Sequence, residues 1–163
     1  MRHILVLTTV LFCSCTSFFT PNFYPSNNNM YSLAESILAE SNKIRKQNNL
    51  PLLAMDKKLQ KIAVNYSKDM AKKNFFSHTD PQNRKLSRRL SLSGVKFLLA
   101  AENLALISKG NFVATEVVQA WLESKDHRLN LLDKKFTQTG IGVVVNGKGH
   151  YYITHIFLQP TSR

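Results

Sequence analysis

The spacing of apolar residues changes once along the chain, and this change limits the fold more than any other feature. In three long segments between residues 33 and 124, apolar side chains recur at intervals of three and four, which is typical of amphipathic helices. Two short runs rich in β-branched and aromatic residues, Gly140 to Val145 and Tyr151 to Phe157, then flank the turn pair Asn146-Gly147 and predict a β-hairpin. A chain that is helical first and ends in a hairpin indicates the α+β class.

Three long helices are predicted from these intervals. The first is expected to begin at Ser32, which has a glutamate three residues later in a capping-box pattern, and to end before Pro51. Asp56 can cap the second helix, which carries the clearest apolar stripe of the chain. Asn111 can cap the third, in which Trp121 is expected to anchor the core. The remaining predicted elements are short: helices near residues 86–90 and over 127–132, and a buried strand over 95–100.

The first fifteen residues have the pattern of an export signal. Arg2 precedes an apolar run from Ile4 to Phe12, which ends in Cys13-Ser14-Cys15. The run is shorter than the ~20 residues that a membrane-spanning helix needs. We therefore predict a lipoprotein signal peptide over residues 1–14, with Cys15 as the lipid-bearing residue. Modification at Cys13, or plain secretion, are the alternatives.

The predicted leader also determines the expected organisation of the chain. Residues 15–32, with prolines and a run of asparagines, have no period and are expected to form a flexible tether, followed by one domain over 33–160. Both cysteines precede this domain, so it cannot contain an internal disulfide. A domain of this size can form a core without one, and we expect a monomer. The predicted location is extracytoplasmic, with the N-terminal lipid in the membrane of the cell envelope, at an outer membrane or the cell surface.

The chain is strongly basic, with 22 Lys and Arg against 10 Asp and Glu and a net charge of +12. The charge favours acidic partners but is spread over several segments. No helix-turn-helix, zinc-finger or aromatic-glycine RNA-binding pattern accompanies it. Nucleic acid is therefore not an expected partner, and a solvated basic surface is the simpler interpretation.

Several ordered segments resemble the bacterial branch of the CAP superfamily, also called SCP, which includes cysteine-rich secretory, antigen-five and pathogenesis-related proteins. The resemblance covers Leu33 to Gln159 and implies an α-β-α sandwich, with a small antiparallel sheet between helical layers and a cleft lined by histidines and acidic residues. The segments that carry it are Asn42-Lys43-Ile44-Arg45, Leu59 with Ala63, Phe76-Ser77-His78, Ala101-Glu102-Asn103-Leu104-Ala105, the run from Trp121 to Leu132, Gly140-Ile141-Gly142, and Tyr151-Tyr152 leading to Phe157.

The resemblance also implies which residues line the cleft. It puts the motif histidines at His78 and His127 and the motif glutamate at Glu102. Ser124 stands where eukaryotic relatives carry a second glutamate, and the neighbouring Glu123 falls on a different helical face. Two imidazoles and a carboxylate form the ligand inventory of an open zinc site, so a divalent cation such as zinc is a candidate ligand of His78, His127 and Glu102, although no cofactor is required.

Two functions follow as hypotheses from this set. The first is a binding or interaction role toward a lipid, a small molecule or a partner protein. The second is a metal-dependent hydrolase that uses the cleft. Ser124, His127 and Glu102 could also form a hydroxyl–imidazole–carboxylate set, but no Gly-x-Ser-x-Gly turn accompanies Ser124. His155 on the last strand is expected either in the cleft or in the core, and His150 beside the hairpin turn is expected at the surface.

Overall fold

The computed structural model describes residues 27–108 and 114–161. The predicted lipid site at Cys15 and the predicted cap at Asn111 lie outside these residues. Within the described ranges, no helix combines the length and the apolar character needed to cross a membrane.

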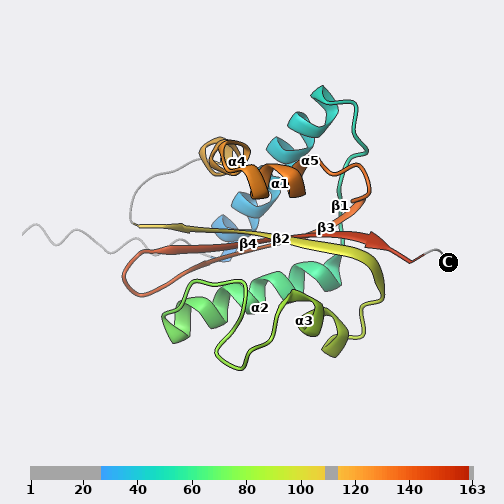
Figure 1. The fold of residues 1–163 in the computed structure, drawn as a ribbon. Helices are drawn as coiled ribbons and strands as arrows, with labels where there is room; N and C mark the ends of the chain where they lie inside the picture. Colours follow the sequence, from blue (N-terminus) through green and yellow to red (C-terminus); the bar gives the residue numbers. More distant parts are fainter. Residues whose placement is uncertain (1–26, 109–113, 162–163) are drawn as a thin grey trace, which may run out of the picture.

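The described residues form five helices and four strands in three layers. Figure 1 shows α1, α4 and α5 on one side of the sheet and α2 and α3 on the other. The α-β-α sandwich predicted above is therefore confirmed. In chain order the elements are α1 (Asn27–Gln47), β1 (Ala54–Met55), α2 (Lys57–Lys73), α3 (Leu86–Leu92), β2 (Phe97–Ile107), α4 (Ala114–Glu123), α5 (Lys125–Leu132), β3 (Gln138–Val145) and β4 (Tyr151–Pro160).

The sheet has the strand order β1-β3-β4-β2, so the long strand β2 forms one edge. The three long strands are antiparallel, as predicted: β3 and β4 form the hairpin, and Glu102 of β2 lies opposite Ile156 of β4. The two-residue β1 adds a parallel pair with β3, which makes the sheet mixed. The functional consequence is an edge strand, β2, that is accessible from both helical layers.

Helix α2 follows the local sequence signals closely. Asp56 caps it as predicted, because its Oδ1 accepts hydrogen bonds from the backbone N–H groups of Lys58 at 2.9 Å and Leu59 at 2.8 Å. The helix ends at Asn74, which adopts the left-handed conformation with φ 54°. The predicted apolar stripe is buried along its whole length: Leu59, Ile62, Ala63, Tyr66 and Met70.

Three predicted boundaries were wrong. Helix α1 begins at Asn27 rather than Ser32, and Ser32 lies inside it, where its carbonyl accepts a hydrogen bond from the Ser36 hydroxyl. The predicted tether therefore ends earlier, because no residue between 27 and 32 prevents the helix from extending toward the N-terminus. Helix α5 begins at Lys125 rather than His127. Strand β2 spans Phe97–Ile107 instead of 95–100, because pairing with β4 extends it.

Three hydrophobic clusters hold the layers together. The largest one lies between the sheet and α1, α4 and α5, and it contains Trp121, which is 2% exposed and therefore has the predicted core position. Smaller clusters lie between the sheet and α2 and α3. A buried arginine, Arg45 of α1, also joins the first layer by donating hydrogen bonds to the carbonyl oxygens of Pro51, Leu131, Asp133 and Phe136.

Candidate functional site

The loop between α2 and α3 carries His78 and is organised by the buried Asp80. The Asp80 carboxylate accepts hydrogen bonds from the backbone N–H groups of Gln82 and Arg84, and Nε of Arg84 pairs with it at 2.6 Å. Burial by itself would raise the pKa of Asp80, but the hydrogen bonds and charge of Arg84 outweigh this effect and lower it. The loop therefore has a fixed shape that holds His78 in place.

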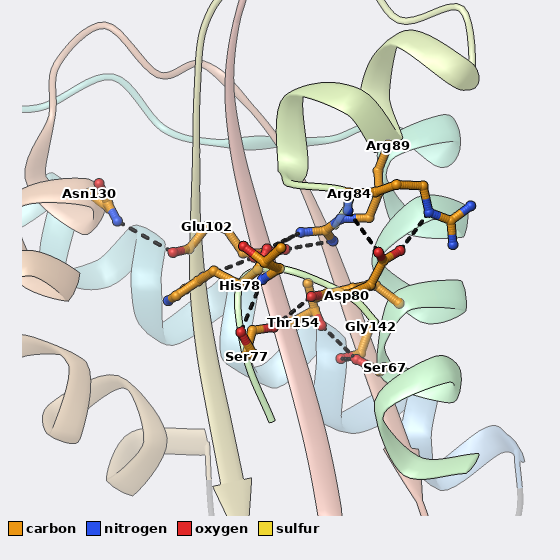
Figure 2. A network of polar contacts seen from close by, with 12 residues as sticks. Ser67, Ser77, His78, Asp80, Arg84, Arg89, Glu102, Asn130, Gly142 and Thr154 are labelled. Carbon is orange, nitrogen blue, oxygen red and sulfur yellow. Dashed lines mark hydrogen bonds and ion pairs between the residues drawn. The ribbon is translucent and has the colours of Figure 1, made fainter. Parts of the chain in front are cut away.

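Glu102 of the edge strand β2 lies at the centre of the polar site. Its carboxylate is 4% exposed and receives both terminal nitrogens of Arg89, at 2.8 and 3.0 Å, in a bidentate ion pair. Nδ1 of His78 lies 2.9 Å from the same carboxylate, while the His78 side chain is 57% exposed. Figure 2 shows His78 and Arg89 approaching Glu102 from the side of the sheet that α2 and α3 cover. Because a carboxylate oxygen can only accept, Nδ1 of His78 is the donor in this contact.

Tyr66 of α2 packs against Arg89 of this ion pair. The guanidinium of Arg89 lies 3.3 Å from the centre of the Tyr66 ring, which is a close cation–π contact. The Tyr66 hydroxyl donates to the carbonyl oxygen of Ser77, next to His78. Burial raises the pKa of Tyr66 to about 12, so this hydroxyl keeps its proton at neutral pH. The ring and the hydroxyl together fix Arg89 and the His78 loop.

His127 approaches the site from α5, in the opposite helical layer. Asn103 of β2 donates to the carbonyl oxygen of His127 at 3.0 Å, and Asn130 of α5 donates to Oδ1 of Asn103 at 2.9 Å. Burial lowers the pKa of His127, and the nearby charge of His78 lowers it further. His127 therefore lies in the helical layer opposite the His78 loop, within range of an electrostatic effect of His78 on its pKa.

A groove runs from His127 along the edge strand. Its volume is about 410 Å³, and apart from His127 and Glu116 its lining is apolar. Trp121 of α4 forms part of the wall, and its Nε1 donates to the carbonyl oxygen of Leu104 in β2 at 3.0 Å. Leu106 and Phe76 are partly exposed, at 42% and 46%. The rest of the apolar lining comes from β2 (Leu104, Ala105 and Ile107) and α4 (Val117 and Ala120).

The remaining candidate residues lie outside this groove. Ser124 occupies the cap position of α5, but its side chain makes no capping hydrogen bond, and within the described residues it has no hydrogen bond to His127 or Glu102. Glu123 is exposed and accepts a hydrogen bond from Gln119. His155 is fully buried between Trp121 and Phe157, which decides between its two predicted positions in favour of the core. The partly exposed His150 precedes β4 at the hairpin turn.

The candidate metal ligands are His78, His127 and Glu102. Among the described residues, no group of three or more His, Cys, Asp or Glu side chains is arranged to hold a metal ion. Glu102 would have to leave Arg89 in order to coordinate one, and breaking a buried ion pair is unfavourable. In this arrangement the carboxylate of Glu102 is therefore engaged by Arg89, and the imidazoles of His78 and His127 are the candidate ligands that remain.

The comparisons with known proteins agree with this geometry. The model of the CAP family, described as the cysteine-rich secretory protein family, matches residues 38–159. The chain belongs to the CAP family. An uncharacterized protein of Bacillus subtilis, YkwD, is 34% identical over 123 residues, which are 76% of this chain and 46% of that protein. This chain thus spans less than half the length of that curated relative.

Solved CAP-type structures have the same fold. An extracellular protein with an SCP domain from Bacillus anthracis has a TM-score of 0.69 and 36% identity, over 83% of this chain and 44% of that one. An outer surface protein from Borrelia burgdorferi has a TM-score of 0.72 and covers 85% of this chain and 97% of its own. Its identity is 22%, so it supports the fold alone.

Sequence reasoning missed the residues that support the CAP site. Arg89 was counted among the solvated basic residues, whereas it is buried against Glu102 and Tyr66. The available signal was a pair of adjacent arginines on a short helix with an apolar face, of which one must point inward. Asn103 and Asn130 fell within the family segments but were given no role.

Proposed function

We propose that this CAP domain is an extracytoplasmic binding protein that takes a small amphiphile into the groove beside β2. The proposal rests on one observation: the carboxylate of Glu102 is already bound by other side chains, whereas the groove next to it is mainly apolar. Glu102 is fully engaged by Arg89 and His78, whereas the adjacent groove offers about 410 Å³ of mainly apolar surface. Ligand sites in proteins are typically apolar concavities of this size with a few polar groups at one end.

The polar end of the groove determines how such a ligand would lie. Its apolar body would contact Trp121, Leu104 and Leu106, which line the groove. Its hydrogen-bonding end would meet His127 and, around the strand edge, Nε2 of His78. Because burial and the charge of His78 lower the pKa of His127, its ring is neutral at pH 7 and can act as a donor or an acceptor.

A calorimetric titration with dodecanoic acid tests this binding role. We expect saturable binding to the wild type and at least a tenfold loss in Leu106→Asp, because the variant puts a charge on the groove wall. The matched control is Leu52→Asp, since Leu52 is 55% exposed and does not line the groove. Equal binding by the two variants would remove the groove as the site.

The extracytoplasmic location and the membrane anchor belong to the same proposal. The similar protein from Bacillus anthracis is described as extracellular, which supports the location. The anchor depends on the signal pattern that ends at Cys15. We expect native protein to begin at an acylated Cys15 and Cys15→Ala to move into the soluble fraction. An unacylated N-terminus beyond Cys15, found by mass spectrometry, would contradict anchoring.

A metal-dependent hydrolase is the second candidate, and the pair of imidazoles favours it. Glu102 orients His78 through Nδ1 and leaves Nε2 available. At metal sites, carboxylates hold ligand histidines in the same way, by accepting a hydrogen bond from the ring nitrogen that does not bind the metal. A distant structural neighbour was solved with Zn²⁺, although its 15% identity supports the fold alone. With two protein ligands, zinc affinity should be weak and should fall on acidification as the imidazoles protonate. Zinc calorimetry on wild type and on the double variant His78→Ala/His127→Ala, combined with a hydrolysis assay, separates this candidate from simple binding.

A further inference from the structure

The positive charge of the protein is concentrated in one layer of the sandwich. Residues 56–97, which contain α2 and α3, hold 11 of the 22 Lys and Arg residues but 3 of the 10 Asp and Glu residues, a net charge of +8 out of +12. The helices of the opposite layer, with their connections (residues 27–55 and 114–136), hold 7 basic and 6 acidic residues. The helical layer of α2 and α3 is therefore strongly basic, whereas the layer of α1, α4 and α5, which Figure 1 shows on the other side of the sheet, is nearly neutral.

The basic side chains of residues 56–97 are exposed, whereas the acidic ones are not. Asp80 is buried with Arg84, Asp56 caps α2, and the half-buried Asp69 pairs with Lys73 at 3.6 Å. Arg89 is the one basic residue of this segment that is buried. The nine exposed basic residues, which we name the basic face, are Lys57, Lys58, Lys61, Lys68, Lys72, Lys73, Lys85, Arg88 and Lys96.

The lysines of α2 form a continuous stripe. Lys57, Lys61, Lys68 and Lys72 are separated by four, seven and four residues, which puts them on one side of the helix, away from the buried stripe. A stripe of this kind can contact a flat anionic surface along the full helix at once. A compact anion would be contacted by one or two of these side chains.

Two exposed leucines flank the connection between α3 and β2. Leu92 at the end of α3 is 57% exposed, and Leu98, at the bulge where β2 begins, is 61% exposed. Lys96 lies between them in sequence, and Nζ of Lys58 donates to the carbonyl oxygen of Gly94 at 3.1 Å, so the start of α2 is close to this connection. Surfaces that bind at the membrane interface typically combine lysines, which can contact lipid phosphates, with exposed apolar side chains.

We propose that the basic face is a docking surface for an anionic lipid bilayer, with its lysines on the phosphate groups and Leu92 and Leu98 inserted among the acyl chains. This surface is independent of both the groove and the lipid on Cys15. A bilayer fits better than nucleic acid because exposed leucines contribute nothing to phosphate contacts in solution. Docking on α2 and α3 would hold the sandwich at the membrane through one layer.

The test compares the full chain on vesicles of phosphatidylcholine alone and of equal parts phosphatidylcholine and phosphatidylglycerol. The readout is the ratio of the affinities for the two kinds of vesicle in a sedimentation assay. All variants share residues 1–26, so any contribution of these residues to binding is the same in each variant. Lys61, Lys68 and Lys72 are changed together to Gln. The matched control changes Lys46, Lys125 and Lys134 to Gln, which lowers the net charge equally but lies outside residues 56–97.

We expect the first triple variant to lose the preference for anionic vesicles by on the order of a hundredfold, and the control by less than threefold. The preference should also fall as salt is added. Equal losses in the two variants would show that net charge, not the basic face, governs binding and would overturn the proposal. These are exposed substitutions with small expected effects on folding, which thermal unfolding checks.

A second pair of variants distinguishes a bilayer from other polyanions. Leu92→Ser/Leu98→Ser should weaken binding to anionic vesicles roughly tenfold while leaving binding to soluble polyphosphate and duplex DNA unchanged. Leu52→Ser/Leu129→Ser is the control, since both leucines are at least 55% exposed and lie outside the basic face. Unchanged vesicle binding in the first pair, or tighter binding to duplex DNA than to vesicles, would overturn the bilayer as the partner.

Discussion

Glu102 has a structural task that explains why it is not free for chemistry. With side chains 4% and 9% exposed, Glu102 and Arg89 connect the edge strand to α3, and His78 is added to the same carboxylate. A buried ion pair gives little net stability compared with apolar residues of the same shape. Removing one partner is strongly destabilising, because the other charge then stays buried without a partner. The pair therefore holds the site's geometry as a unit.

The first prediction follows from this pairing. Glu102→Gln should lower the free energy of unfolding by about 3–5 kcal/mol, because Arg89 would keep its charge without a carboxylate. Denaturant unfolding measures the change, and adding Arg89→Met should restore much of the loss. Asp69→Asn, which breaks a half-exposed pair, is the control and should change stability by less than about 1 kcal/mol. A similar, small effect of both single variants would show that the Glu102 pair is not effectively buried.

His155 is the second residue whose environment has a measurable consequence. It is fully buried, and neither ring nitrogen has a hydrogen-bond partner among the described residues. Burial lowers the pKa of His155 to about 3, and the positive charge of Arg45 acts in the same direction. The unfolded chain binds a proton below about pH 6.5, whereas the folded protein does not, so stability is lost as the pH falls from 6.5 toward 3.

We therefore predict that His155→Phe makes stability less dependent on pH. Between pH 6.5 and 5 the wild type should lose about 1.6 kcal/mol more than the variant, since one proton corresponds to about 1.36 kcal/mol per pH unit and the unfolded histidine is half protonated at pH 6.5. Unfolding curves recorded across this range give the difference directly, even if the variant is less stable at neutral pH. Parallel curves for wild type and His155→Phe would show that His155 titrates normally.

At the scale of elements, the contact between α2 and β3 depends on glycine. A Cβ at Gly142 would overlap the backbone of Ala63 and Val64, and one at Gly140 would overlap the backbone of Leu59 and Gln60. The close approach allows the Ser67 hydroxyl of α2 to donate to the carbonyl oxygen of Gly142 at 3.1 Å. The sequence Gly140-Ile141-Gly142 is therefore a packing motif for the second helical layer.

Gly142→Ala should destabilise the protein by about 3 kcal/mol or more, because the added methyl group meets helix backbone that cannot rotate away. Gly147→Ala is the matched control, since a Cβ there meets no atom within 4 Å. Thermal unfolding of both variants decides the point. Equal midpoints would mean that α2 can move outward from β3 without loss.

At the scale of the whole molecule, the described core lies within residues 27–160. Met30 and Leu33 pack against the larger core cluster, and Ala34 is 2% exposed within it. We predict that a chain beginning at Asn27 unfolds within a few degrees of the full chain. A chain beginning at Glu35 should lose roughly 3 kcal/mol of stability, because these apolar contacts are gone. Calorimetry of the two truncated chains measures this, and equal stability would place the domain start later than α1 indicates.

The parts of the molecule that sequence could predict are those set by neighbouring residues. Asp56 and Asn74 delimit α2 through local backbone geometry. The α-β-α architecture was implied by the family resemblance, with which the order of the predicted helices and hairpin agreed. The full length of β2 could not be predicted, because it depends on pairing with β4 fifty residues later. The Glu102–Arg89 pair joins residues 13 apart on a strand and a helix, and no periodic pattern reports such a contact.

The central claim is that the groove beside β2 binds an amphiphile, and the chain's single tryptophan offers the most direct measurement. Trp121 lines the groove, so its fluorescence reports contact with a bound ligand that carries a quencher. We predict saturable quenching by 12-bromododecanoic acid in the wild type and in Leu52→Asp, and its loss in Leu106→Asp. No saturable quenching in the wild type, or equal quenching in both variants, would contradict the account.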